Sequence, residues 1–430
     1  LRWSAMIWDP PFAPGCPQRS AKVSDMRSVA EHRSVVLGNH GALPAVHLPL
    51  LSAQGLVLSS AVTAAWPLPS FNNSSMDGYA IRVADVAGAG EDTPITLRVI
   101  GDVAAGHVPD SGVVEGSAIR IMTGAPMPEG ADAVVPVEWT DGGMATVAIR
   151  RAPERGGYLR IRGEDVAQGD LVLLAGNIVN ARTTALLAAS GHADVAVHRR
   201  PRVAVISTGD ELIEPGLPLT RGLIADSNSF MLMAVVQEAG AEAYRCGPVR
   251  DDEAELERVL REEAPRADLI LTTGGVSMGA YDTVKAVLSR VGGVDFVKVA
   301  MQPGMPQGSG VIDGTPIVTL PGNPVSAYVS FEVFVRPLLR TLLGHAHITR
   351  PQLQIRCGRD FTSPSGKTQF ARVQIVTRHD GVVAIPEGAQ GSHILGGLAR
   401  ADALAEIPPD ITSVREGDSL AVVDLRQEPS

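Results

Sequence analysis

The sequence predicts a multidomain protein in which one α/β domain with a parallel sheet is combined with β-rich regions. The chain of 430 residues exceeds the usual length of a single domain. From about residue 180 to residue 344, strand-like and helix-like patterns alternate at the spacing of βαβ units. On both sides of this region, short runs with a period of two are separated by Gly, Pro and Asp, which is typical of small sheets or barrels.

The composition supports folded domains and restricts the partners. Hydrophobic residues make up 45% of the chain and charged residues 20%, so a sizeable core is available. The net charge of −10 opposes nucleic acid as a partner, because such binding relies on Lys and Arg to neutralise phosphates. A small anion is not excluded, since a few local cations and backbone N–H groups can hold one.

The cysteines and the hydropathy pattern indicate the cellular compartment in which the protein is expected. Cys16, Cys246 and Cys357 are far apart and form no CxxC pair, so neither a disulfide framework nor a zinc site is indicated. A reducing cytoplasm fits this pattern. No apolar run reaches the roughly 18 residues that a membrane span needs. We therefore expect a cytoplasmic protein with no membrane partner.

The α/β region has an explicit expected order. Residues 202–207 form an apolar run of the kind found in buried strands, and further strands are expected at 243–246, 268–272, 295–300 and 316–320. The expected helices begin after Asp226, after Asp251 or Asp252, near Val284, and at Pro324, the last one reaching about Leu343. This alternation predicts a parallel sheet of about five strands.

The flanking regions are expected to be mostly β. Residues 95–100, 117–122, 133–137 and 145–149 have strand-like patterns, and no helix of weight is expected among them. A weakly helical spacing at residues 26–37 precedes them. After Gly344 the period of two returns, which predicts a C-terminal β domain.

Three glycine-containing turns follow strands of the α/β region, at residues 207–211, 272–279 and 320–326. Open parallel sheets place their ligand crevice at this end of the strands. Glycines there let backbone N–H groups close around phosphate oxygens, and the hydroxyls of Thr273 and Ser277 can add hydrogen bonds. Pro324 is suited to the first position of a helix whose N-terminus faces an anion. For any single turn, a purely connecting role remains the alternative.

Charged side chains accompany these turns. Carboxylates beside a phosphate-binding edge suit Mg²⁺, and five are expected there: Asp210, Glu211, Asp226, Asp251 and Asp282. Helix capping alone is an equal alternative for Asp226 and Asp251. Lys285 and Lys298 are candidates for neutralising a pyrophosphate, with a solvated surface position as the alternative.

Six short motifs follow one another along the chain: Ser75-Met-Asp-Gly-Tyr-Ala, Arg120-Ile-Met-Thr-Gly-Ala-Pro, Arg162-Gly-Glu-Asp, Ser207-Thr-Gly-Asp-Glu-Leu, Thr273-Gly-Gly-Val-Ser-Met-Gly and Leu320-Pro-Gly-Asn-Pro-Val-Ser. In this order they resemble the MoeA family, the molybdopterin molybdenumtransferases, which includes the gephyrin E domain. Each motif is weak by itself, whereas six in order are highly specific. The resemblance extends from about residue 26 to the C-terminus.

The resemblance implies a homodimer of four-domain subunits. Residues 26–60 and 160–185 would form an extended linker domain in two segments, and residues 61–159 an inserted β-rich domain. Residues 186–344 would form the molybdopterin-binding α/β domain, and residues 345–430 a C-terminal β-barrel-like domain. Residues 1–25 are interpreted as a disordered or non-native extension. The family's site lies between the α/β domain of one subunit and the inserted domain of the other.

The implied reaction consumes adenylyl-molybdopterin and molybdate as substrates and releases AMP and molybdenum cofactor, with Mg²⁺ assisting. Glu211, Asp251 and Asp282 would be the acidic residues at the nucleotide and metal site. Lys298 would pair with phosphate or molybdate, and Asp77 and Thr123 would face the site from the partner subunit.

The remaining implied residues contact the pterin nucleotide or molybdate. Pro321 and Pro324 would shape the molybdate-side loop, and Arg372 and Ser392 would close the site from the C-terminal domain. The other expected cofactor-binding residues are Thr208, Gly209, Asp210, Asp226, Ser227, Asn228, Thr273, Gly274, Gly275, Ser277, Lys285, Gly322 and Asn323.

Three positions depart from the family pattern. Gln302 occupies a place where some members carry a second Lys, Ser309 stands where an aromatic residue is expected, and Asn72 replaces an Asp.

Two other functions remain open. One is a non-catalytic molybdopterin-binding scaffold or paralogue, against which the presence of Asp77, Glu211, Asp282 and Lys298 argues. The other is a molybdopterin adenylyltransferase, for which the α/β domain alone would suffice. Docking of other enzymes of the pathway is a further possibility.

Overall fold

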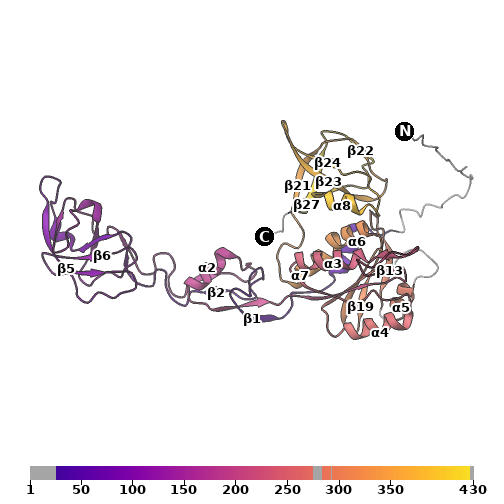
Figure 1. The fold of residues 1–430 in the computed structure, drawn as a ribbon, viewed down its shortest axis with the longest axis horizontal. Helices are drawn as coiled ribbons and strands as arrows, with labels where there is room; N and C mark the ends of the chain where they lie inside the picture. The colour runs from indigo at the N-terminus through magenta and orange to yellow at the C-terminus, as the bar shows by residue number, and fades with distance from the viewer. Residues whose placement is uncertain (1–25, 275–282, 292, 427–430) are drawn as a thin grey trace, which may run out of the picture. The chain divides into compact units, whose positions relative to one another are not determined.

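The computed structural model describes residues 26–274, 283–291 and 293–426. The chain forms two compact units (Figure 1). Unit 1 comprises Leu1–Gly41, Arg200–Leu342 and His347–Ser430, and unit 2 comprises Ala42–Arg199 and Leu343–Ala346. The predicted extension at residues 1–25 lies outside the described residues.

The α/β domain of unit 1 is built on a six-stranded sheet with the strand order β15-β12-β16-β20-β19-β17. Its strands are β12 (Arg202–Ser207), β15 (Glu242–Arg245), β16 (Leu269–Thr273), β17 (Asp295–Lys298), β19 (Pro306–Ile312) and β20 (Thr315–Leu320). The first four strands in the spatial order are parallel, and β19 runs antiparallel to both of its neighbours. The sheet is therefore mixed.

The prediction of about five parallel strands missed β19. This strand contains Pro306, Gly308 and Gly310, residue types that are depleted in strands and that hide the apolar alternation. A side chain at Gly308 would meet Thr319 Oγ1 at 2.1 Å, so the close packing of β19 on β20 requires glycine there.

Helices cover both faces of this sheet (Figure 1). They are α3 (Ser227–Glu238), α4 (Glu253–Glu263), α5 (Thr283–Val291), α6 (Pro324–Ser330), the π-helical turn η4 (Phe331–Val335) and α7 (Arg336–Leu342). Leu256 and Leu260, one helical turn apart on α4, pack with α5 against the buried face that contains Ile270. Helix α3 contacts β12, and α6 contacts β20 and α3. Every predicted helix of this region is confirmed.

Helix α1 (Val29–Leu37) also belongs to unit 1. Ser28 and Glu31 form a reciprocal capping box, which satisfies backbone N–H groups at the helix start. The helix packs against η4 and α7.

The C-terminal domain is a closed barrel of the strands β23-β24-β21-β27-β25, completed by pairing of β23 with β25. Their bounds are β21 Gln352–Cys357, β23 Thr368–Arg378, β24 Gly381–Pro386, β25 Ala403–Ile407 and β27 Ser419–Asp424. The smaller elements are β22 (Phe361–Thr362), β26 (Ser413–Val414) and α8 (Leu395–Arg400). Strand β18 (Met301–Gln302) extends the sheet parallel to β23 and so joins the barrel to the α/β domain. The prediction of a C-terminal β barrel is confirmed.

Unit 2 has two parts: a small core formed by two chain segments, and a curled β sheet. In the first part, β1 (Ala45–Pro49) pairs with β11 (Asp194–His198), and β2 (Val62–Thr63) pairs with β10 (Leu171–Leu173) beside helix α2 (Ala181–Ala189). Chain segments on either side of the β-rich insertion therefore share one core, which includes Leu58 and Leu187.

The β-rich part of unit 2 has a five-stranded sheet in the order β7-β4-β6-β5-β8. Its strands are β4 (Gly78–Ile81), β5 (Ile95–Val103), β6 (Ser117–Ile121), β7 (Ala133–Pro136) and β8 (Thr146–Ile149), and the short β3 (Asn73–Ser74) pairs with β9 (Leu159–Arg160). Tyr79 and Ala80 belong to different core clusters, as expected for alternating side chains. The two helical turns described here are short: η2 (Val83–Val86) and η3 (Val137–Trp139). The four predicted strands are confirmed.

No helix among the described residues is long and apolar enough to cross a membrane.

Candidate functional site

Asn228 connects two of the three predicted turns at the carboxyl edge of the α/β sheet, and a backbone hydrogen bond joins the third turn to them. Its Nδ2 donates hydrogen bonds to Thr273 Oγ1 at 2.9 Å and to the Gly322 carbonyl oxygen at 2.7 Å. Thr273 Oγ1 in turn donates to the Pro321 carbonyl oxygen at 3.2 Å. The backbone N–H of Thr208 donates to the Thr273 carbonyl oxygen at 3.1 Å. The turns are thus one hydrogen-bonded assembly.

Glycine is required at the contact between two of these turns. Gly274 has a φ of +101°, and an added Cβ would lie 2.6 Å from the Thr208 carbonyl oxygen. Nearby, Thr208 Oγ1 and Asn228 Oδ1 are buried without a hydrogen-bond partner among the described residues. Two buried acceptor-capable groups therefore face the region where the turns meet.

Asp226 acts as the N-cap of α3. Its Oδ1 accepts from the backbone N–H of Ser229 at 3.1 Å, and its Oδ2 accepts from the hydroxyls of Ser207 and Ser229, both at 2.6 Å. These bonds engage both carboxylate oxygens of a buried side chain. Ser227, the first residue of α3, is exposed.

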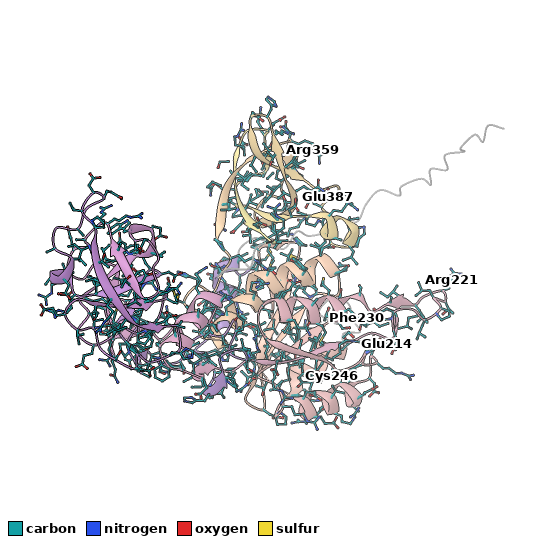
Figure 2. The ribbon with its side chains drawn as sticks, turned by 60° about the vertical axis from the view of Figure 1, so that its left-hand side comes forward. Glu214, Arg221, Phe230, Cys246, Arg359 and Glu387 are labelled. Carbon is teal, nitrogen blue, oxygen red and sulfur yellow. The ribbon has the colours of Figure 1, made fainter. Side chains whose placement is uncertain are left out.

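Arg245 on β15 contacts Asp226 and two other side chains near the start of α3. It lies 3.6 Å from Asp226 Oδ2, pairs with Glu214, and places its guanidinium 4.4 Å from the ring centroid of Phe230. Figure 2 labels Glu214 and Phe230 on this side of the α/β domain. The pairing with Glu214 raises the pKa of Arg245 above its usual value.

Two of the acids expected at this edge, Asp210 and Asp251, are joined by a hydrogen bond to the Asp251 backbone. Asp210 Oδ1 accepts from the backbone N–H of Asp251 at 3.2 Å. Glu211 is exposed, and its carboxylate lies over Gly209, where an added Cβ would be 2.5 Å from Oε2. Asp252, and not Asp251, caps α4, so capping does not account for Asp251. Within the described ranges, no three His, Cys, Asp or Glu side chains form a metal-binding group.

Three predicted residues of the Thr273 turn, Gly275, Ser277 and Asp282, lie outside the described residues.

The two predicted lysines differ in their surroundings. Lys285 is exposed on α5, with its ammonium 5.8 Å from the ring centroid of Phe296. Lys298 is half-buried at the end of β17, and its ammonium has no hydrogen bond or ion pair with any residue that the structure describes.

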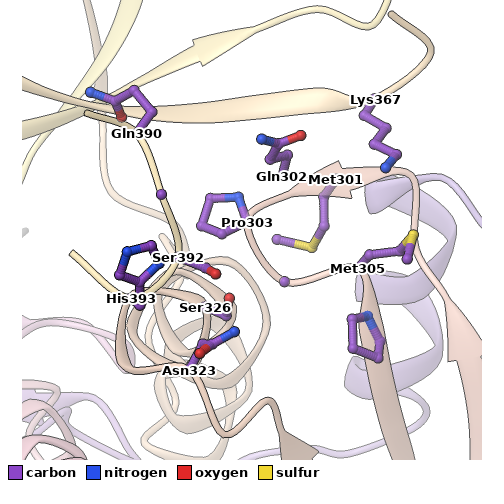
Figure 3. A pocket seen from close by; sticks show the side chains of 13 residues that line it. Met301, Gln302, Pro303, Met305, Asn323, Ser326, Lys367, Gln390, Ser392 and His393 are labelled. Atoms are coloured by element: carbon purple, nitrogen blue, oxygen red, sulfur yellow. The ribbon is translucent and has the colours of Figure 1, made fainter. Parts of the chain in front are cut away.

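A pocket of about 410 Å³ lies between the α/β domain and the C-terminal barrel of unit 1 (Figure 3). Asn323 and Ser326 line it from the start of α6, and Gln302 lines it from β18. Ser392 lines it from the barrel side. Asn323 is the N-cap residue of α6 but makes no capping hydrogen bond with its side chain, which points into the pocket instead. Pro324 occupies the first turn of α6, as predicted.

The loop that carries Ser392 is held by Arg372. The guanidinium of this buried residue donates to the carbonyl oxygens of Gly391 at 3.0 Å and Ala389 at 2.6 Å. The side-chain amide of Gln390 accepts from the Arg372 backbone N–H at 2.9 Å and donates to the Arg372 carbonyl oxygen at 3.1 Å. The Ser392 carbonyl oxygen accepts from the N–H of Val325 on α6 at 3.2 Å. Arg372 therefore affects the pocket by positioning this loop, and it does not line the pocket itself.

Asp77 and Thr123 meet in unit 2. The backbone N–H and the hydroxyl of Thr123 donate to Asp77 Oδ1 at 2.7 and 2.8 Å. These two hydrogen bonds, the backbone one foremost, lower the pKa of the exposed Asp77 carboxyl. Two predicted turns that are far apart in sequence thus form one polar pair.

The three departures have distinct environments. Gln302 pairs with Gln369 across β18 and β23 and lines the pocket. Ser309 is buried on β19, with its hydroxyl unpartnered among the described residues. Asn72 accepts through Oδ1 from the Arg162 backbone N–H at 2.7 Å, a hydrogen bond that an Asp carboxylate oxygen would accept equally.

The pocket residues that were not predicted as site residues include Lys367, Gln390, His393 and Met305. Lys367 and His393 lie in polar or glycine-containing turns of the β domain, which resemble ordinary surface loops in sequence. The proximity of His393 to the predicted Ser392 was the available signal.

Fold and site define a class: a multidomain α/β and β protein with a polar turn assembly at a sheet edge and a separate polar pocket beside it. Residues 27–191 match the MoeA N-terminal region (domain I and II), residues 204–341 a probable molybdopterin binding domain, and residues 354–425 the MoeA C-terminal region (domain IV).

Individual proteins agree with these matches. "Molybdopterin molybdenumtransferase 2" of Mycobacterium tuberculosis (strain ATCC 25618 / H37Rv) is 48% identical over 406 residues, which cover 93% of this chain and 100% of that protein. "Molybdopterin molybdenumtransferase 1" of the same strain is 38% identical over 424 residues, covering 94% and 100%. The crystal structure of a molybdopterin biosynthesis MoeA protein from Pyrococcus horikosii superposes with a TM-score of 0.80 at 31% identity, covering 93% of this chain and 99% of that one.

The chain belongs to the MoeA family of molybdopterin molybdenumtransferases. The prediction of this family, and with it of a transferase, is confirmed.

Proposed function

We propose that this chain inserts molybdate into adenylyl-molybdopterin, releasing AMP and forming molybdenum cofactor. The observation that carries the proposal is the adjacency of two anion-compatible regions in unit 1. Asn228 holds the Gly322 carbonyl oxygen in the turn assembly, and the next residue, Asn323, lines the pocket. A reaction that brings a pyrophosphate and an oxyanion together needs two such regions side by side.

The turn assembly suits the pyrophosphate of the pterin nucleotide. Backbone N–H groups of glycine-containing turns bind phosphate oxygens, and the unpartnered Thr208 Oγ1 can donate another hydrogen bond. When an oxygen of water or molybdate attacks one phosphorus and the bridging P–O bond breaks, AMP leaves with one phosphate and the other phosphate stays with the pterin. The incoming oxygen completes the phosphate on the phosphorus that it attacks. The described parts of these turns, which are hydrogen-bonded to one another through Thr208, Thr273 and Gly322, would stabilise the charge that develops on the bridging oxygen.

Mg²⁺ is part of the proposal. Glu211 and Asp251 would hold it, with Asp282 as the third predicted acid, and substrate oxygens would complete the coordination because Mg²⁺ usually takes only one or two carboxylates. Two observations support this proposal: Glu211 is exposed, and the backbone of Asp251 is hydrogen-bonded to Asp210, the residue next to Glu211 in the chain. When bound, Mg²⁺ supplies neutralising charge to the pyrophosphate oxygens. Lys298 and Lys285 are proposed as further cations for the same anions.

The pocket suits molybdate. None of the described residues that line it is an Asp or Glu, and it offers amide and hydroxyl donors from Gln302, Ser326 and Ser392. Arg372 positions Ser392 through the loop 389–391. Pro321 and Pro324, on either side of the Gly322–Asn323 turn, would fix the boundary between the pocket and the turn assembly.

The direct test is AMP release from adenylyl-molybdopterin with Mg²⁺, with and without molybdate. We expect molybdate-dependent release that Glu211→Ala abolishes and that Glu91→Ala, an exposed change in unit 2, leaves unchanged. Tight pterin binding without molybdate-dependent release would identify a non-catalytic scaffold. Formation of adenylyl-molybdopterin from ATP would identify an adenylyltransferase.

We further propose a homodimer in which Asp77 and Thr123 act on the partner subunit's site. Neither Glu211→Ala nor Asp77→Ala should be active alone, whereas a mixture that exchanges subunits should regain activity, because one of the two sites in the mixed dimer carries neither change. If both residues served the same subunit's site, the mixture would stay inactive. Light scattering tests the dimer separately.

We also propose a cytoplasmic location. Cys246 and Cys357 are free thiols, as expected in a reducing compartment. Cell fractionation tests this location.

A further inference from the structure

The lysine that lines the pocket comes from the barrel side. The α/β side contributes the neutral Gln302 and the thioethers of Met301 and Met305. The barrel side contributes Lys367 and His393 (Figure 3). Since no described lining residue is acidic, the pocket selects against cations and favours an anion.

Lys367 is held in place by its neighbours in the chain. The N–H of Gly366 donates to the Pro409 carbonyl oxygen at 2.8 Å, and the N–H of Thr368 donates to the Ala300 carbonyl oxygen at 2.9 Å. Thr368 also lies opposite Met301 in the β18–β23 pairing. The backbone that presents Lys367 is therefore anchored both to the barrel and to the segment that forms the pocket's other wall.

The ammonium of Lys367 lacks a partner within the described residues. The side chain is half-buried, yet it makes no hydrogen bond or ion pair with them. A partly desolvated cation without a carboxylate neighbour is stabilised by a bound anion. In a chain with a net charge of −10, such a local cation also offsets the general repulsion of anions.

We propose that Lys367 is the binding residue that supplies the positive charge for the oxyanion in this pocket, in place of a cation at position 302. This inference rests on the proposed function and assigns the specificity of the same pocket. Oxyanion binding then depends on the barrel as well as on the α/β domain, since β18 sets the position of Lys367 relative to Gln302.

The test is calorimetric titration of the full chain with sodium molybdate alone. We expect Lys367→Gln to weaken binding about tenfold or more, the usual effect of losing a charge-assisted hydrogen bond. Lys367→Arg should keep most of the affinity. Adding Gln302→Lys to the Lys367→Gln variant should restore binding, because the charge returns from the opposite wall. Arg415→Gln removes an exposed charge from the same domain and should change nothing.

Unchanged molybdate affinity of Lys367→Gln, with thermal denaturation showing a folded protein, would overturn the inference. A loss of affinity in Lys367→Arg as large as in Lys367→Gln would also overturn it, since the charge would not matter. The assay of AMP release separates the two proposals. If the wild type releases AMP, Lys367→Gln should raise the half-saturating molybdate concentration and keep the maximal rate. If the wild type releases none but Lys367→Gln weakens molybdate binding, the proposed reaction fails and the inference about Lys367 stands.

Discussion

The guanidinium group of Arg372 donates a hydrogen bond of 3.0 Å to the backbone carbonyl oxygen of Gly391. With the second bond to Ala389 and the amide of Gln390, it turns the loop before Ser392 into a fixed part of the barrel. The guanidinium is buried, and its Nε has no partner among the described residues. Burial lowers the pKa of Arg372 below its usual value. Burying the Arg372 cation is unfavourable because the charge loses its hydration, and its hydrogen bonds position one wall of the pocket.

Replacing Arg372 with Lys should destabilise the protein and weaken molybdate binding together. A lysine ammonium cannot reach both carbonyl oxygens with the planar geometry of a guanidinium, so we expect a loss of about 2–3 kcal/mol in the free energy of unfolding. Urea denaturation and molybdate titration measure the two effects. Arg415→Lys is the control in the same domain, since Arg415 is exposed and exposed substitutions usually change stability little. Equal stability of the two variants would refute the positioning role.

Asn228→Ala should loosen the turn assembly at the sheet edge. The change removes the hydrogen bonds to Thr273 and Gly322, and we expect a cost of about 1–2 kcal/mol in the free energy of unfolding and weaker AMP binding. A double-mutant cycle with Thr273→Val isolates the contact between the two side chains. We expect their effects to be non-additive, with a coupling of roughly 0.5–1.5 kcal/mol. Strictly additive effects would show that the contact contributes nothing.

The residues of this assembly show what sequence patterns can and cannot predict. Strand β12 and the turn after it were predictable, because an apolar run followed by Thr-Gly-Asp has a local physical meaning. The helix after Asp226 was predictable from its cap. The bridge from Asn228 to Gly322 joins residues 94 positions apart, and no local pattern encodes it. Tertiary packing alone creates that contact.

The pocket illustrates the same limit. Its walls come from residues 301–306, from the start of α6 and from the loop 390–393, which meet through β18 and the barrel. Lys367 lies in the sequence Ser-Gly-Lys-Thr, which is typical of a solvent-exposed turn. Arg372 was expected to close the site, and in the structure its guanidinium is engaged by the loop 389–391. Strand β19 was missed because its glycines are required by neighbours that only the folded sheet supplies.

Thr123→Ala should raise the pKa of Asp77 only in part. The backbone N–H of Thr123 is the larger cause of the lowered pKa and survives the substitution, while the hydroxyl is lost. Because a carboxyl with a lowered pKa stays ionised to lower pH, the variant should protonate at higher pH than the wild type. Carbon-detected NMR titration of the Asp77 carboxyl measures this shift. A pKa in Thr123→Ala equal to that of the wild type would show that the hydroxyl bond is absent in solution.

Helix α1 should make the protein sensitive to acid through His32. This imidazole is fully buried, lies edge-on to Phe334 with ring centroids 4.8 Å apart, and has no hydrogen-bond partner for either nitrogen among the described residues. Burial, with a smaller effect of Arg27, lowers the pKa of His32 from 6.5 to about 4. In the unfolded chain the imidazole takes up its proton near pH 6.5, whereas in the folded chain it does so only near pH 4.

Stability linked to His32 is therefore complete above pH 6.5 and is lost progressively as the pH falls from 6.5 toward 4, because the unfolded state then binds more protons. The loss amounts to about 3 kcal/mol at the acid end of that window. Urea unfolding followed by circular dichroism across this range measures it in the wild type and in His32→Leu, where the pH dependence should be flatter by that amount. His107→Leu, a change at an exposed histidine of unit 2, should follow the wild-type curve. Parallel pH curves for the wild type and His32→Leu would mean that water or an acceptor reaches the imidazole, so that α1 packs less tightly on η4 than the structure indicates.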